Sequence, residues 1–118
     1  MNILSVEGGS LPAGKGGSPS DTFDESVVTY QEGKETKTLT VTYVRYFQTV
    51  LAEQGIYDHE KEEIPLYKIV ALLYLEKYPN SKESRHYYND TKHFLQLFEG
   101  FSVQAFKEKY ATKLALVS

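Results

Sequence analysis

A break in composition near residue 25 limits how much of this chain can form a hydrophobic core. The first 25 residues are rich in Gly, Ser and Pro, and they contain a single aromatic residue, Phe23. All 10 Tyr and the remaining Phe residues follow the break. A segment so poor in large apolar side chains cannot bury enough surface to offset the entropy lost on ordering. We therefore predict a flexible N-terminal arm over residues 1–25 and one globular domain over residues 26–118.

The arm begins with an apolar tip that consists of Ile3, Leu4 and Val6. The Gly-rich residues after the tip would serve as a tether, and a tethered apolar segment can add a strand to the sheet of a neighbouring protein. The ordinary alternative is a frayed terminus without contacts. We take the three residues of the tip as candidate partner-binding residues.

The C-terminal half carries the strongest helix signals. Pro65 suits the first turn of a helix that runs to about Tyr78. This helix is apolar on nearly all sides, so it should be the central buried element. Asn80 favours the start of a second helix that Gly100 ends, and Ser102 favours the start of a third.

The N-terminal half favours a short hairpin. Residues 27–30 and 36–43 are rich in β-branched side chains, and residues 32–35 can form the turn between them. Helical spacing competes with the second strand and continues through Gln54, with Gly55 placed where a helix would end. The predicted fold class is therefore mainly α: a small domain of three to four helices, with a short N-terminal β-hairpin, preceded by the flexible arm.

No motif in the chain requires an enzyme or a cofactor. The absence of Cys excludes disulfide and thiolate chemistry. Residues 9–16 match the core of a phosphate-binding loop, but Gly16 replaces the hydroxyl residue that should bind Mg²⁺, and no parallel sheet is predicted downstream. We predict a non-enzymatic protein with no cofactor and no small-molecule substrate.

Three polar residues of the predicted second helix have the spacing of a metal site. His86, Asp90 and His93 would share one helical face, and such side chains can bind Zn²⁺. Arg85 and Lys92 flank that face and disfavour a cation. We therefore predict no metal site.

The polar face of the predicted helix over residues 81–99 is basic within an acidic protein of pI ≈ 5.6. A helix that presents such groups suits the major groove of DNA, although the low pI disfavours nucleic acid as a partner. Tyr87 is a candidate partner contact, because Tyr87 and Tyr88 cannot both point inward from a helix. The candidate nucleic-acid-binding residues are Lys82, Arg85, Asn89, Lys92 and His93.

These features predict a small interaction or structural component of a larger assembly. It would contact a protein partner or a second copy of itself through the arm and a Tyr-rich surface, with DNA binding as the alternative function. The size and layout also suit an accessory protein of a phage or mobile element. The longest apolar run, residues 64–75, is shorter than the roughly 20 residues of a spanning helix, and no secretion signal is apparent, so we predict a cytoplasmic protein without membrane contact.

Overall fold

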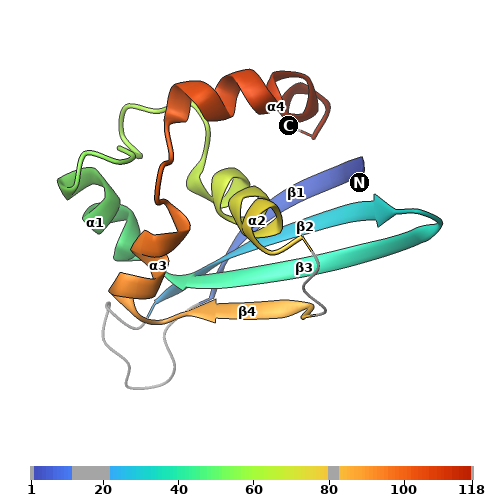
Figure 1. Cartoon of the computed structure of the whole chain (residues 1–118). Coiled ribbons are helices and arrows are strands. Elements are labelled where there is room, and N and C mark those ends of the chain that lie inside the picture. Colours follow the sequence, from blue (N-terminus) through green and yellow to red (C-terminus); the bar gives the residue numbers. More distant parts are fainter. Residues whose placement is uncertain (1, 12–21, 80–82, 118) are drawn as a thin grey trace.

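The computed structural model describes residues 2–11, 22–79 and 83–117. Its centre is a four-stranded sheet in the order β1-β2-β3-β4, with the helices gathered on one side (Figure 1). The strands are β1 (Asn2–Leu11), β2 (Phe23–Glu32), β3 (Glu35–Val44) and β4 (Arg85–Tyr88). The helices are α1 (Phe47–Glu53), α2 (Leu66–Lys77), α3 (Thr91–Leu97) and α4 (Val103–Val117).

The predicted mainly α fold class is wrong, because the chain has a mixed α/β fold. Strands β1, β2 and β3 form an antiparallel meander, and β4 pairs with β3 in parallel. The connection from β3 to β4 contains α1 and α2, as a parallel pair requires a long crossover. Residues 2–11, which the sequence assigned to a flexible arm, pair with β2 along the length of β1. Residues 12–21 of the predicted arm lie outside the described residues.

The predicted hairpin is confirmed and is longer than expected. Gly33 lies in its turn with φ 65°, a conformation that favours Gly. Burial alternates along β2, where Ser26, Val28 and Tyr30 face the helices. No helix in the described part of the chain is long and apolar enough to cross a membrane.

Helix α2 is the central buried element, as predicted. Ile69, Val70 and Ala71 are fully buried. The start of α2 packs closely on the sheet where two small residues, Gly8 and Ser26, are paired. Ser26 donates a hydrogen bond to the carbonyl of Tyr67, and the Tyr67 ring lies directly over Gly8. Small side chains on β1 and β2 therefore set the approach of α2.

A cluster of aromatic rings around Phe94 joins the other elements. The Phe94 side chain is fully buried, and its ring lies 4.9 Å from Phe47 of α1 and 5.5 Å from Tyr43 of β3. The rings of Tyr88 and Phe98 lie at 5.5 and 5.2 Å. Helix α3 is thereby fixed to both the sheet and α1.

The predicted single helix over residues 81–99 is also wrong. Residues 85–88 form β4, and α3 begins only after Asp90, whose side chain accepts a hydrogen bond from the His93 N–H at 3.1 Å. Asp is a strong N-cap residue, so it starts a new helix at this point. His86, Asp90 and His93 consequently do not share a helical face.

Candidate functional site

The outer edge of β4 presents backbone groups that the sheet does not use. The Thr40 N–H donates to the Ser84 carbonyl at 2.8 Å, and Thr42 lies opposite Tyr87. In this parallel register Thr40 and Thr42 direct their backbone groups toward β4. Arg85 and Tyr87 must then direct their own N–H and C=O groups away from β3. Within residues 2–11, 22–79 and 83–117, no strand pairs with β4 on that side.

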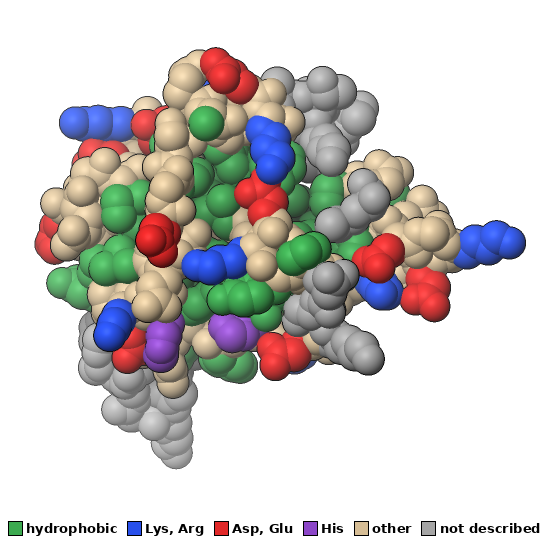
Figure 2. Space-filling view, in the orientation of Figure 1, with side chains coloured by type: hydrophobic (Ala, Val, Ile, Leu, Met, Phe, Trp, Pro, Cys, Tyr) green, Lys and Arg blue, Asp and Glu red, His purple; other side chains and the backbone are tan. Residues whose placement is uncertain are grey.

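A cleft of about 270 Å³ lies along this edge, where β4 meets α3. The view in Figure 2 shows two histidine side chains near each other over this region, below an apolar centre. We call this hollow the edge cleft. It is lined by residues of β4, of the two positions after β4, of α3 and of the position after α2: His86, Tyr87, Tyr88, Asn89, Asp90, His93, Gln96 and Tyr78.

The wall formed by β4 is aromatic and firmly held. The His86 ring lies 4.9 Å from the Tyr74 ring and 4.5 Å from the Tyr88 ring, and its Nδ1 is 3.5 Å from the Glu83 carboxylate. Burial raises the pKa of Tyr88, and the neighbouring Tyr78 and Tyr74 raise it further. The Tyr88 hydroxyl therefore keeps its proton throughout the physiological range.

The wall formed by α3 is polar. Asp90 accepts the His93 N–H, and the Nδ1 of His93 lies 3.7 Å from the same carboxylate oxygen. The Lys77 ammonium donates to the Gln96 carbonyl at 2.8 Å, which joins the end of α2 to α3. The edge cleft thus combines rings on one side with hydrogen-bonding groups on the other. Such a mixture suits a side chain that is apolar with a polar end.

The other side chains of β4 point to the face of the sheet that lies away from the helices, which we call the open face. Tyr87 is 58% exposed there, and its ring packs edge-on against Phe23 of β2 at 6.1 Å. Arg85 lies on the same face, because side chains alternate along a strand. The predicted partner contact Tyr87 is therefore accessible to a partner.

The other residues predicted to bind a partner or nucleic acid lie apart from one another in the structure. In β1, Val6 is buried in the core and only Leu4 of the predicted apolar tip is largely exposed, at 42%. Of the predicted basic set, Asn89 and His93 line the edge cleft, whereas Lys92 lines a shallow apolar hollow of about 650 Å³ on α3. Lys82 lies outside the described residues.

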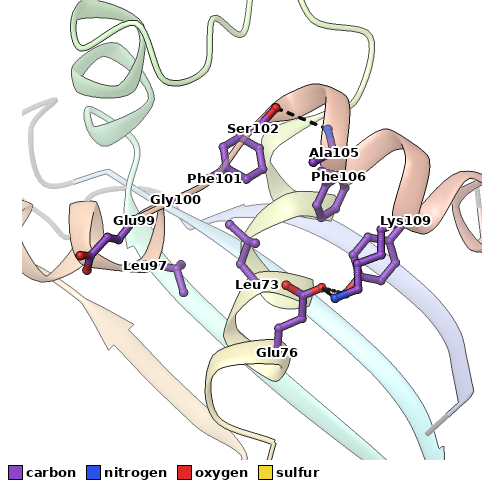
Figure 3. A pocket seen from close by; sticks show the side chains of 11 residues that line it. Leu73, Glu76, Leu97, Glu99, Gly100, Phe101, Ser102, Ala105, Phe106 and Lys109 are labelled. Carbon is purple, nitrogen blue, oxygen red and sulfur yellow. Dashed lines mark hydrogen bonds and ion pairs between the residues drawn. The ribbon is translucent and has the colours of Figure 1, made fainter.

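A third hollow, which the sequence did not reveal, lies between α2, α4 and the loop that precedes α4 (Figure 3). It has a volume of about 190 Å³ and is mainly apolar, with Leu73, Phe101 and Phe106 in its walls. At one end Glu76 accepts a hydrogen bond from the Tyr110 hydroxyl and forms an ion pair with Lys109 at 2.5 Å. These contacts attach α4 to α2, so we interpret this hollow as part of a structural junction.

Comparison with known proteins gives no match to a family model, a curated protein or a solved structure. Within the described residues, no group of three His, Asp or Glu side chains is placed to hold a metal ion. The function must therefore be inferred from the chemistry of the surfaces themselves. The β4 edge offers the richest combination, because unused backbone groups, exposed rings and a cleft meet there.

Proposed function

We propose that this chain is a non-enzymatic binding module that accepts an extended segment of a partner protein as an added strand on β4. The observation that supports the proposal is the outward direction of the Arg85 and Tyr87 backbone groups beside the edge cleft. In recognition by strand addition, main-chain hydrogen bonds provide affinity and pockets for alternate side chains provide specificity. Both components are available at this edge.

The β1 edge is a weaker candidate for the same role. It is long, with 10 residues, but Gly8 and Gly9 at its centre offer a partner no side chain to contact. Among the β1 side chains that the structure describes, Leu4 is the most exposed apolar one, whereas Val6 lies in the core. The β4 edge has both a cleft and the exposed Tyr87 within four residues.

Binding to nucleic acid remains a prediction, but it was based on a single helix over residues 81–99, and residues 85–88 form a strand instead. Helix α3 has 7 residues, and Arg85 lies on a strand. The carboxylates of Glu83 and Asp90 accompany the two histidines at the edge. These negative charges would oppose a phosphate backbone.

The substitution Tyr87→Pro tests the proposal directly. It removes an N–H that faces outward, and an edge strand tolerates Pro where the N–H is not needed by its neighbour. We would select peptides from a random twelve-residue library displayed on phage against the full chain. Selected peptides should protect the Arg85 and Tyr87 amides from hydrogen exchange. They should bind Tyr87→Pro about ten-fold more weakly, since the loss of about 1.4 kcal/mol corresponds to that factor.

Two controls distinguish the effect of losing the Tyr87 N–H from the effect of losing its ring and from unfolding. Tyr87→Ala removes the ring but keeps the N–H, so it should weaken binding less than Tyr87→Pro does. Circular dichroism of each variant verifies that the fold is retained. The proposal is wrong if the library yields no binder, or if selected peptides bind Tyr87→Pro as tightly as the parent chain.

A further inference from the structure

The two faces of β4 differ in chemistry, and this difference constrains any strand that binds there. His86 and Tyr88 point toward the helices and line the edge cleft. Arg85 and Tyr87 point to the open face of the sheet. Since side chains alternate along a strand, consecutive residues of an added strand would meet the edge cleft and the open face in turn.

On the added strand, the side chain that enters the edge cleft is selected by its size and polarity. Its volume of about 270 Å³ equals roughly nine water molecules at about 30 Å³ each, which is room for a large aromatic side chain. The rings of Tyr78, His86 and Tyr88 can pack against an aromatic guest. Asp90 and Gln96 offer oxygen acceptors at the polar wall. A guest with a ring and a hydrogen-bond donor, Trp or Tyr, satisfies both walls.

On the added strand, the side chain that lies beside Arg85 on the open face is selected by its charge. Its side chain is exposed and forms no ion pair or hydrogen bond with any residue that the structure describes. The other arginine of the sheet region, Arg45, is already paired with Asp24 at 3.0 Å. A guanidinium binds a carboxylate through two parallel hydrogen bonds, so Arg85 favours Asp or Glu on the adjacent strand.

Resting on the proposed function, we infer that the partner is an extended segment with Trp or Tyr for the edge cleft and a single Asp or Glu for Arg85. The two side chains must be an odd number of positions apart, because they face opposite sides of the sheet. They are neighbours if the ring lies beside His86, and three positions apart if it lies beside Tyr88. A spacing of two would place both on one face.

Three acetylated and amidated nine-residue peptides of Thr and Val test this inference. Each contains one Trp, with Glu at the next position, with Glu two positions away, or with Lys at the next position. The chain contains no Trp, so the peptide is the only source of Trp fluorescence. The Trp-Glu peptide should bind about three-fold more tightly than the other two, as expected for an exposed ion pair. Its emission should shift to shorter wavelength as the ring is buried.

Charge reversal supplies the decisive comparison. In Arg85→Glu the order should reverse, so that the Trp-Lys peptide binds best. Lys92→Glu, which changes charge equally on α3 but away from the edge cleft, should leave the order unchanged. The inference is overturned if the three peptides bind equally, whereas the proposed function survives if Tyr87→Pro still weakens them. If none of the three peptides binds, the inference is overturned, and the library selection alone decides the proposed function.

Discussion

Substitution of Gly8 by Ala should destabilise the protein, although Gly8 lies in a strand where Ala is ordinarily tolerated. A Cβ atom at this position would lie 2.4 Å from Cδ1 and 2.5 Å from Cγ of Tyr67. Rotation of the ring about χ2 leaves Cγ in place, so relief of that contact requires a different χ1 or a shift of α2. The neighbouring Gly9 offers a matched control, since the nearest atom to its added Cβ is the Glu25 carboxylate at 4.0 Å.

The two substitutions should change the free energy of unfolding in opposite directions. Overpacking at Gly8 should lower it by about 1–3 kcal/mol. Gly9→Ala should raise it by about 0.4–1 kcal/mol, because Ala reduces the entropy of the unfolded chain and Gly9 does not have positive φ. The resulting difference of about 1.4–4 kcal/mol corresponds to roughly 6–16 °C in Tm for a chain of this size.

Urea unfolding of both variants measures this difference. The background Tyr67→Ala removes the ring, so the penalty at Gly8 should largely disappear there. Equal stability of Gly8→Ala and Gly9→Ala in the parent chain would refute the reasoning. It would show that the Tyr67 ring does not approach Gly8 closely enough to exclude a side chain there.

Three further predictions concern the core, a helix cap and alkaline pH. Phe94→Ala should lower the free energy of unfolding by about 3–5 kcal/mol in urea titrations, since its ring joins α1, α3 and the sheet; a loss below about 1 kcal/mol would contradict this. Asp90→Ala should cost about 1 kcal/mol and Asp90→Asn much less, because Asn also caps helices; equal losses would exclude the capping role. Burial raises the pKa of Tyr57 to about 12, helped by nearby carboxylates, so the folded chain retains a proton that the unfolded chain releases above pH 10. Stability should be constant up to about pH 9 and fall between about pH 10 and 12, with a smaller fall in Tyr57→Phe; an unchanged urea midpoint at about pH 11 would contradict this.

Elements that depend on local signals could be predicted from the sequence. Pro65 and the apolar run after it define α2, and the Gly55 residue with φ 71° follows α1 as expected. The Ser102 hydroxyl accepts a hydrogen bond from the Ala105 N–H at 3.4 Å, which confirms the cap of α4. In each case the stabilising contact lies within a few residues of the signal.

Strand β1 could not be predicted because its stabilisation comes from distant residues. Gly-rich composition usually indicates a flexible segment. At Gly8, however, the missing side chain is what admits the Tyr67 ring, 59 positions later in the sequence. Composition alone does not distinguish a glycine that loosens a chain from one that permits close packing.

Strand β4 was missed because two periodicities fit the same residues. Tyr87, Tyr88 and Phe94 fit the apolar stripe of a helix. The two tyrosines also fit a strand, in which side chains alternate between the faces and only Tyr88 faces the core. The structure buries Tyr88 to 5% exposure and leaves Tyr87 at 58%. Either geometry exposes one of the two tyrosines, so the sequence identifies Tyr87 as a candidate contact whether it lies on a helix or on a strand.

The short length of β4 makes the edge cleft decisive for binding. Only Arg85 and Tyr87 direct backbone groups outward, so an added strand gains few main-chain hydrogen bonds, each worth about 0.5–1.5 kcal/mol net. Association costs about 4–15 kcal/mol in lost freedom of motion, so four such bonds, about 2–6 kcal/mol in total, cannot hold a partner firmly on their own. A side chain in the edge cleft must supply the rest, roughly 2–3 kcal/mol for a buried apolar ring. Short length and an exposed charge also protect an edge from indiscriminate pairing. A peptide of Thr and Val without an aromatic residue should therefore show no binding to this edge, whereas the same peptide with Trp should bind.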